Sequence, residues 1–419
     1  MFILRKRFLP ILLASSLFAA CGSSEPVGTG DPNDGDIPMT CLGGTQTALN
    51  PPAPGVGPNV VFTAVGDNIA SGLIDMEFLP GRNGESLVIT KDGAVYYLKR
   101  DFTLVPASET IATRQDGSER GLLNVAADPL YTENCYVYFY YTVPGSSPDV
   151  NRIERYSVRS DPDAGEFALT NPQVIMEFPK SSGATNHNGG SMVFMDQDHL
   201  AAGVGEGNVP DSAQDKDSPL GKLHRFVPNR DFNAGGLDPA FSGNGVSTVT
   251  PSVYSLGLRN PFTLVLDNEG DLFVGDVGAG TYEEINCVYY AGENYLWPTC
   301  EGPCVLLDPI NPIHGYAHTA GTAFDPDFDS GGGGKTIIVS AYYRGNQYGG
   351  LFTDRIIYND FYDGFVRLLT MDQNERVISD QHIGNQPFLL GLQTNPADGL
   401  LYGVSLSGNE RVLRMDLEP

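Results

Sequence analysis

The stretch ATNHNGGSMVF, residues 184–194, places a histidine between two asparagines, and two glycines and an apolar strand follow. A neutral imidazole accepts a proton near neutral pH, because its unperturbed pKa is about 6.5. His187 is therefore a candidate general base. The two glycines would let the backbone approach a flat ligand closely. The alternative is a turn histidine with no chemical role, and the stretch alone leaves both interpretations open.

Two further stretches put charged side chains just before apolar strands. In SLGLRNPFTLVLD, Arg259 and Asn260 precede Pro261 and a strand that should be buried. An arginine there could stabilise negative charge on a substrate or cofactor, or it could brace a turn through backbone carbonyls. In GSERGLLNVAADPLY, Glu119 and Arg120 stand in the same position before their strand. We expect all four to face one mouth of the fold.

The stretch GDVGAGTYEEIN, residues 275–286, is rich in oxygen atoms that could bind a metal ion. Asp276, the Gly278 carbonyl, Glu283 and Glu284 fall within ten residues. Calcium takes six to eight oxygen ligands and accepts irregular loops. The spacing is not that of an EF-hand, so a solvated acidic turn is the competing interpretation.

The elements that must position these residues are short strands. Amphipathic helical periodicity is nearly absent, and runs rich in Val, Ile, Tyr and Phe recur between Gly, Asp, Asn or Pro residues. A weak repeat combines an Asp/Gly turn, an alternating strand and small residues. Four copies are KDGAVYYLKR, MDQDHLAAGVGEG, DNEGDLFVGDVG and PADGLLYGVSLSG, and two less regular candidates are ADPLYTENCYVYFYYT and YNDFYDGFVRLLTMD.

Six units of about 60 residues suit four-stranded blades with long loops. The sequence therefore predicts an all-β chain, a six-bladed β-propeller over residues 46–419. We expect the segment NVVFTAV, residues 59–65, to pair with the C-terminal strand ERVLRMDLEP and so close the ring.

The N-terminus, MFILRKRFLPILLASSLFAAC, indicates export. Three basic residues precede an apolar run that is too short to span a bilayer, and small residues precede Cys21. This predicts a lipoprotein signal over residues 1–20, acylation of Cys21 and a flexible tether over residues 21–45. The protein would then be lipid-anchored on a periplasmic or cell-surface face. An ordinary secretory signal followed by a free cysteine is the alternative.

The net charge limits the possible partners, and the cysteines indicate disulfides rather than a zinc site. The formal net charge is −26, which repels phosphate backbones and argues against a nucleic-acid partner. In an oxidising compartment some of the six cysteines should pair, and Cys300 and Cys304 could close a small loop. A zinc site is disfavoured, because no histidine pair lies at ligand spacing near the cysteines.

Taken in order along residues 60–415, these motifs resemble a known family. RGLLNVAADPLY, NHNGGSMVF, LGLRNPFTLVLDNEGDLFVGDVGAGTYEEIN, ENYLWPTCEGP and SAYYRGNQYGGLF are similar to the soluble pyrroloquinoline quinone (PQQ)-dependent glucose, aldose-sugar and sorbosone dehydrogenases. The resemblance implies a six-bladed propeller with PQQ at the channel mouth. It implies oxidation of an aldose at C1 to a lactone, with electrons passed on to a further acceptor.

The resemblance also implies roles for individual residues. His187 matches the base that takes the proton of the anomeric hydroxyl, while Arg259 stabilises the developing negative oxygen. The set expected to hold PQQ is Glu119, Arg120, Arg259, Asn260 and Arg344. Calcium bound to PQQ would polarise the C5 carbonyl as a Lewis acid, and the expected metal ligands are Asp276, Gly278, Glu284 and Tyr295.

Two other functions fit the same sequence. Glu119 replaces a glutamine common in the family, and Asp360 and Asp363 occupy a segment where some members place arginines. Those departures favour a propeller lipoprotein that lost its cofactor and binds a glycan or a protein. A calcium-dependent hydrolase or lactonase of propeller type is the third possibility, because such enzymes use acidic ligands and a channel water.

Overall fold

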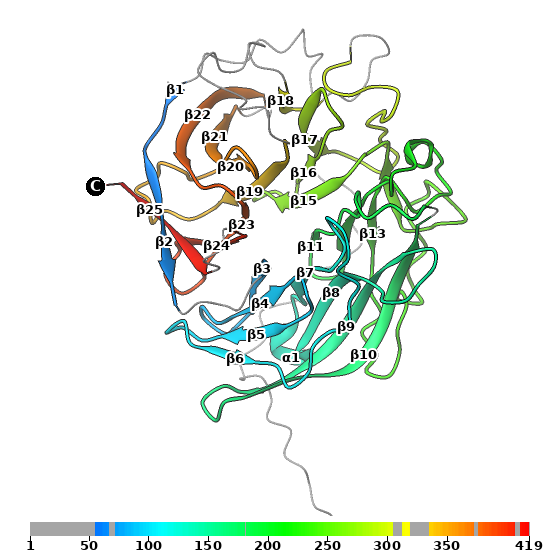
Figure 1. Ribbon diagram of the computed structural model, residues 1–419, viewed down its shortest axis with the longest axis horizontal. Helices are drawn as coiled ribbons and strands as arrows, with labels where there is room; N and C mark the ends of the chain where they lie inside the picture. The colour runs from blue at the N-terminus through cyan, green and yellow to red at the C-terminus, as the bar shows by residue number, and fades with distance from the viewer. Residues whose placement is uncertain are drawn as a thin grey trace, which may run out of the picture.

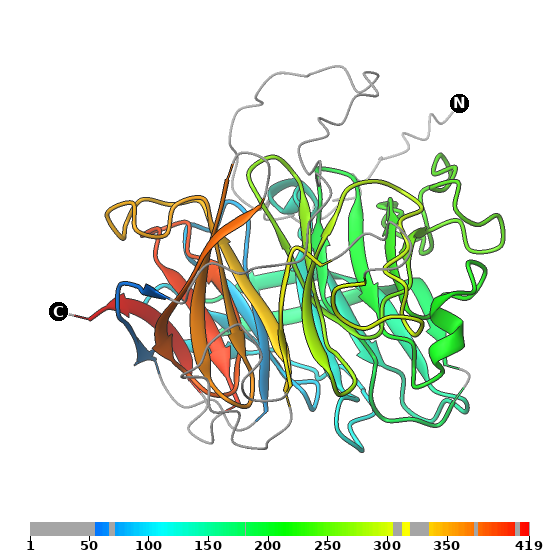
Figure 2. The same ribbon diagram turned by 90° about the horizontal axis from the view of Figure 1, so that it is seen from above.

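A computed structural model describes residues 55–66, 72–180, 182–304, 312–318, 335–372, 376–406 and 411–418 of the chain. Its regular structure is almost entirely β-strand, arranged as five four-stranded sheets and one five-stranded sheet around a common axis (Figure 1). Seen after a quarter turn, the strands run through the thickness of the ring and the loops lie at their ends (Figure 2). The predicted six-bladed β-propeller is confirmed.

The strands follow one another from the centre of the ring outwards in five of the six sheets. The first two sheets are β3 (Leu73–Phe78), β4 (Ser86–Thr90), β5 (Val95–Leu98) and β6 (Leu104–Pro106), then β7 (Leu122–Ala127), β8 (Tyr136–Thr142), β9 (Val150–Asp161) and β10 (Glu166–Pro179). The next two are β11 (Met192–Phe194), β12 (Leu200–Val204), β13 (Lys222–Phe226) and β14 (Val253–Leu256), then β15 (Pro261–Leu266), β16 (Leu272–Asp276), β17 (Tyr282–Val288) and β18 (His314–Ala317). The fifth is β19 (Ile337–Tyr343), β20 (Arg355–Asp360), β21 (Phe365–Met371) and β22 (Val377–Asn385).

The sixth sheet joins the two ends of the described chain. It contains β23 (Leu389–Thr394), β24 (Leu401–Ser405), β25 (Val412–Leu417) and, outermost, β2 (Val60–Val65). Strand β2 pairs antiparallel with β25, with Val60 opposite Leu417. The predicted closure of the ring by N- and C-terminal segments is thus confirmed. A short strand β1 (Gly55–Val56) adds parallel to β22, and two single turns, α1 (Tyr131–Asn134) and η1 (Pro210–Ala213), complete the regular elements.

The hydrophobic core lies between blades. Each of the six buried apolar clusters joins two neighbouring sheets. Strand β8 shows how the sequence achieves this, because all seven of its residues are buried. Successive side chains of a strand point to opposite faces. Val137 and Phe139 therefore enter the cluster shared with the preceding sheet, while Tyr138 and Tyr140 enter the cluster shared with the next.

The repeat was correct in number but mixed two kinds of turn. The motifs beginning at Met195, Asp267 and Pro396 contain the turn between the first and second strands of a sheet. Those beginning at Lys91 and Tyr358 contain the turn between the second and third strands. Both turns use Asp and Gly for the same conformational reason, since Gly adopts positive φ and Asp bonds its own backbone. The two kinds of turn are therefore indistinguishable in sequence.

The N-terminal predictions fall outside the described residues. These are the signal over residues 1–20, the acylated Cys21 and the tether over residues 21–45. Within the described part of the chain, no helix is long and apolar enough to cross a membrane. The predicted small loop is present, since Cys300 and Cys304 form a disulfide.

Candidate functional site

His187 lies in a tight loop that leads into the inner strand β11. The residue has a left-handed backbone, with φ of 54°, which is uncommon outside glycine and costs free energy. The neighbouring glycines make the loop possible. A Cβ atom on Gly189 would meet the Gly203 carbonyl at 2.4 Å, and one on Gly205 would meet the His187 carbonyl at 2.3 Å. The glycines thus seat the loop against the end of β12.

The imidazole of His187 is buried between the carboxylate of Glu206 and the guanidinium of Arg259. Its Nδ1 makes a short hydrogen bond with the Glu206 carboxylate, and its Nε2 lies 2.9 Å from Nη2 of Arg259. A carboxylate accepts and a guanidinium donates, so these partners fix the tautomer: Nδ1 carries the proton and Nε2 presents a lone pair. His187 and Glu206 expose only 6% and 0% of their surfaces. The ring is therefore a neutral, oriented proton acceptor.

Asn260 and Glu119 hold the backbone of the His187 loop. Asn260 accepts a hydrogen bond from the Gly189 N–H at 2.9 Å, and Glu119 accepts one from the Asn188 N–H at 3.1 Å. The Asn260 amide also reaches Glu119 at 3.4 Å. Both residues were predicted to contact the cofactor. In the structure their side chains hydrogen-bond to the histidine loop and to each other, and the N–H donors around Glu119 compensate its negative charge; contact with the cofactor stays a prediction.

Lys180 fixes the loop from the other side. The lysine is buried, and its Nζ donates to the Ala184 carbonyl at 2.6 Å, the Asn186 carbonyl at 3.2 Å and the Asn188 side-chain oxygen at 3.0 Å. Burial lowers the pKa of Lys180. Three acceptors around one ammonium order the backbone on both sides of His187. The sequence expectation that Asn186 or Asn188 orients the ring is therefore wrong, because Glu206 does so.

Arg259 is fixed by the loop that follows β16. Its Nη1 donates to the carbonyls of Val277 at 2.7 Å and Gly278 at 2.6 Å, and its guanidinium lies 5.4 Å from the ring centre of Trp297. Asp276 accepts the backbone N–H groups of Arg259 and Asn260 at 3.0 and 2.7 Å. His187 and Arg259, seventy-two positions apart, converge at one end of the ring.

The predicted calcium ligands are not assembled as one ligand set. Both carboxylate oxygens of Asp276 accept hydrogen bonds from backbone N–H groups. Glu284 accepts from the Gly302 N–H at 2.5 Å and the Asn286 amide at 3.2 Å. Tyr295 is buried, and its hydroxyl donates to the Cys287 carbonyl at 2.8 Å. Among the described residues, no three His, Cys, Asp or Glu side chains gather in a way that could hold a metal ion.

Burial shifts the titration of these two acids. It raises the pKa of Asp276 to about 6, although the backbone N–H groups of Arg259 and Asn260 act in the opposite direction. It raises the pKa of Glu284 to about 8, and the nearby charge of Asp276 adds to the effect. These two acids face each other across β16 and β17, and at neutral pH Asp276 is mostly charged while Glu284 is mostly protonated, so the pair carries about one negative charge rather than two. That reduces their attraction for a cation.

Arg120 and Arg344 have partners away from the His187–Arg259 pair, so their cofactor roles stay predictions that these contacts do not support. Arg120 is buried, with its guanidinium bound to Asp149 and to the Gly183 carbonyl at 3.1 Å. Arg344 donates to the carbonyls of Leu266, at 2.9 Å, and Asp267, at the end of β15. That strand starts beside Arg259 and spans roughly 20 Å at about 3.3 Å per residue. Arg344 therefore lies at the other end of the channel.

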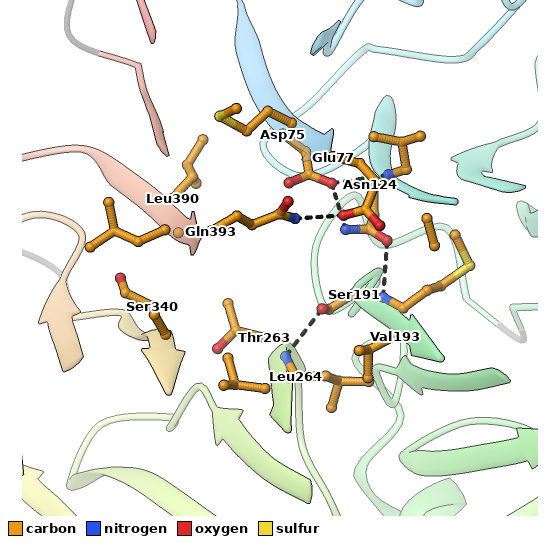
Figure 3. A pocket seen from close by; sticks show the side chains of 18 of the residues that line it. Asp75, Glu77, Asn124, Ser191, Val193, Thr263, Leu264, Ser340, Leu390 and Gln393 are labelled. Atoms are coloured by element: carbon orange, nitrogen blue, oxygen red, sulfur yellow. Dashed lines mark hydrogen bonds between the residues drawn. The ribbon is translucent and has the colours of Figure 1, made fainter. Parts of the chain in front are cut away.

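The channel between the two ends contains a cavity of about 600 Å³, lined by the six inner strands (Figure 3). Polar side chains on one inner strand accept hydrogen bonds from the backbone of the next. The pairs are Asp75 with Val125 N–H at 3.0 Å, Asn124 with Met192 at 3.0 Å, Ser191 with Leu264 at 3.1 Å, Thr263 with Val339 at 3.0 Å and Gln393 with Phe78 at 3.3 Å. The polar lining thus satisfies strand edges that would otherwise be unpaired.

Two carboxyl groups of this lining are strongly perturbed. Burial raises the pKa of Asp75 to about 8 and that of Glu77 to about 7, despite hydrogen bonds that favour the charged forms. Glu77 accepts from the Gln393 amide at 2.7 Å (Figure 3). Both carboxyl groups accept hydrogen bonds from neighbouring blades, so we assign them a structural role in holding adjacent blades together.

Sequence reasoning missed Glu206, Trp297 and Glu301. Glu206 follows the small residues of β12, a position with no motif of its own, and only its pairing with His187 reveals it. Three buried polar atoms around the site have no hydrogen-bond partner within the described chain: Glu206 Oε2, Arg259 Nε and Trp297 Nε1. Buried polar groups are normally paired, so this group of atoms indicates a polar ligand.

Comparisons with known proteins give a family match for this chain. The sequence profile of the glucose/sorbosone dehydrogenase family matches residues 72–384. The uncharacterised Synechocystis protein slr1608 is 24% identical over 378 residues, which cover 81% of this chain and 83% of that protein. The aldose sugar dehydrogenase YliI of Escherichia coli is 25% identical over 224 residues, covering 53% of this chain and 58% of that enzyme.

A solved structure supports the fold. The PQQ-bound form of an aldose sugar dehydrogenase from Streptomyces coelicolor superimposes with a TM-score of 0.66 at 23% identity. The superposition covers 87% of this chain and all of that one.

Proposed function

Since the chain belongs to the glucose/sorbosone dehydrogenase family and is an oxidoreductase of the aldose sugar dehydrogenase type, we propose that it oxidises the C1 hydroxyl of an aldose to a lactone with PQQ as the hydride acceptor. His187 and Arg259 are the proposed catalytic residues. The observation that carries the proposal is the pair of contacts made by the two ring nitrogens of His187. Its Nδ1 is held by a buried carboxylate, and its Nε2 faces a guanidinium at 2.9 Å.

The residues of the chain provide the proton chemistry. A sugar hydroxyl that displaces the Arg259 N–H from Nε2 of His187 would meet the lone pair and give up its proton there. Glu206 stabilises the imidazolium that results and keeps the ring in its orientation. Arg259 then stabilises the negative charge that develops on the sugar oxygen. When bound, PQQ supplies the acceptor for the hydride that leaves C1, so the proton and the hydride leave by separate routes.

The donors at the site fit an anionic, planar quinone. PQQ presents carbonyl and carboxylate oxygens, and the buried Nε–H of Arg259 and Nε1–H of Trp297 lack an acceptor among the described residues. The two groups lie beside each other, with the guanidinium 5.4 Å from the indole. Arg259 and Trp297 are therefore the residues that we propose hold PQQ. Asn260 and Glu119 act indirectly, by keeping the histidine loop in place.

Calcium binding remains a prediction. Of the four expected ligands, only the Gly278 carbonyl faces the site, because Arg259 contacts it at 2.6 Å. Carbonyl oxygens suit calcium, whereas Asp276, Glu284 and Tyr295 have partners elsewhere. The Gly278 carbonyl, however, already accepts a hydrogen bond from the Arg259 guanidinium, whose positive charge would repel a cation, so calcium stays a prediction with no ligand assigned among the described residues.

A cofactor-free binding propeller is the second candidate. It is favoured by the positions of Arg120 and Arg344, because neither can neutralise a carboxylate of PQQ at this site. Such a protein would use the same end of the ring to bind a glycan or a protein, without turnover.

One titration separates the two candidates. Trp297 is the only tryptophan of the chain, so its fluorescence reports binding at the site. PQQ should quench this fluorescence saturably, with or without added calcium, and the loaded protein should reduce a dye in the presence of aldoses. A Trp297→Phe variant removes the signal and serves as the control. Failure of PQQ to bind under either condition would reject the proposal in favour of the binding propeller.

We also propose that the protein is exported and acylated at Cys21, with electrons passing to an acceptor outside the propeller. The basic, apolar and small-residue segments before Cys21 support the proposal.

A further inference from the structure

Glu301 lies between the two cysteines of the Cys300–Cys304 disulfide and holds a neighbouring loop through one oxygen. Its Oε1 accepts four backbone N–H groups, from residues 279, 280, 281 and 282, at 2.7, 3.0, 3.1 and 3.2 Å. Burial acts to raise the pKa of Glu301, but the Thr281 hydroxyl and the backbone N–H groups together lower it to about 2. A charged acceptor makes each of these hydrogen bonds stronger than a neutral one.

The loop that Glu301 holds presents its carbonyl groups to Arg259. Val277 and Gly278 immediately precede the four N–H donors, and their carbonyls accept from Arg259 Nη1 at 2.7 and 2.6 Å. The turn is too tight for a side chain at Gly278, where a Cβ atom would meet the Tyr282 carbonyl at 1.7 Å and Glu301 Oε1 at 2.9 Å. The N–H groups of this loop therefore face Glu301, while its carbonyls face the guanidinium.

The segment that carries Glu301 also contacts Arg259 directly. The Trp297 ring packs against the guanidinium, and the Trp297 backbone N–H donates to the Gly257 carbonyl at 2.9 Å. Gly257 lies two residues before Arg259. Residues 297–304 thus fix the arginine from two directions, and the arginine in turn contacts His187 Nε2.

We propose that Glu301 is a positioning residue for the dehydrogenase reaction. It acts by ordering the loop over residues 277–282, which aims the Arg259 guanidinium at His187 and at the substrate oxygen. Glu301 touches neither His187 nor Arg259, so its effect passes through backbone groups. The inference rests on the proposed function, since it assigns Glu301 a part in the same site.

The test compares Glu301→Ala and Glu301→Gln with the exposed Glu269→Ala as the matched control. Hydrogen exchange of the amides of residues 279–282 is measured first, because it needs no activity. The alanine variant should exchange at least about tenfold faster there, since four hydrogen bonds lose their acceptor. The glutamine variant, which keeps an oxygen acceptor, should lie between the alanine variant and the wild type.

Kinetics then show whether the loop acts through Arg259. Glu301→Ala should lower kcat at least about tenfold, with KM for the aldose changed less than about threefold, because the lost contact stabilises the transition state. Added to Arg259→Ala, it should lower kcat by less than about twofold, because residues that act as one unit are not additive. The thermal midpoint of each variant identifies any general loss of folding.

Faster exchange at residues 279–282 with unchanged kcat would overturn the inference, as would full additivity with Arg259→Ala. Unchanged exchange would show that Glu301 does not hold the loop, and would overturn it without reference to activity. If the wild-type protein with PQQ oxidises no aldose, the proposed function fails, and the exchange result still decides whether the loop depends on Glu301.

Discussion

Replacing Glu206 by Gln should remove most of the activity and leave the fold intact. Glu206 is fully buried and bound through one oxygen to His187 Nδ1. When the imidazole takes up a proton, the carboxylate stabilises the positive ring. A neutral amide of the same shape keeps the packing and can still accept the Nδ1 hydrogen bond, but it lacks the charge.

The size of the effect follows from the separation of the two charges. At about 4 Å and an effective dielectric constant of about 20, the attraction is worth about 4 kcal/mol. The positive charge of Arg259 and relaxation of the site reduce the net value, so a loss of about 3–4 kcal/mol is expected. Each 1.36 kcal/mol is a factor of about ten in rate, which predicts a fall in kcat of about 10²- to 10³-fold.

The assay is steady-state dye reduction by the PQQ-loaded protein across a range of aldose concentrations. The dissociation constant for PQQ, measured by Trp297 fluorescence, should change by less than about threefold, because Glu206 acts on the base. The exposed Glu269→Gln is the matched control for loss of one carboxylate. A Glu206→Gln variant that binds PQQ normally and keeps kcat within about threefold would refute the assignment of this carboxylate to the base.

Three further predictions concern Arg259 at the site, Asp75 in the channel lining and Cys21 near the N-terminus. Arg259→Lys should lower kcat/KM about 10- to 100-fold, because lysine lacks the planar guanidinium that contacts His187, Val277 and Gly278 at the same time. A variant with the kcat/KM of the wild type would show that the guanidinium is not needed. Asp75 has a folded pKa of about 8, above its unfolded value of 3.8, so the folded state retains a proton that the unfolded chain loses, and stability should fall as pH rises from about 4 to about 8. The free energy of unfolding should change by at most about 1.4 kcal/mol per pH unit through this group. In denaturant unfolding, Asp75→Asn, which can still accept the Val125 N–H, should show a flatter dependence of stability on pH than the wild type. Parallel pH profiles for the two proteins would contradict the raised pKa of Asp75. Cys21→Ser should move the protein from the membrane fraction to the soluble exported fraction without changing the kcat of the purified protein, as measured by fractionation and activity; unchanged membrane association would count against acylation.

The architecture was accessible from the sequence because it depends on local signals. Asp and Gly turns between runs such as CYVYFYYTV identify strands and their number, and strand β8 is buried on both faces as its continuous apolar character suggests. The sequence could not show which two strands of a sheet each turn connects, because all the turns within a sheet use the same Asp and Gly chemistry. The polar lining of the channel was not anticipated either, since the acceptors Asn124 and Thr263 are matched to donors on neighbouring blades.

The site was accessible only in part. His187 and Arg259 converge as expected, because each directly precedes an inner strand and such positions meet at one end of a propeller. The same rule placed Arg120 at the site, yet its side chain turns inward to Asp149. Side-chain direction depends on partners that only tertiary structure supplies. Glu206 and Glu301 were missed for that reason, since each acts on a loop distant in sequence.

The most direct test of the central claim is a single-turnover reduction of bound PQQ, with no external acceptor, by wild-type protein and by His187→Ala. The oxidised cofactor is loaded to the same occupancy in both proteins, an aldose is added, and the change in the absorption spectrum of the quinone is followed. The wild type should reduce one equivalent of PQQ, and His187→Ala should be slower by at least about 100-fold, the usual contribution of a general base. Reduction at the wild-type rate by His187→Ala would contradict the account.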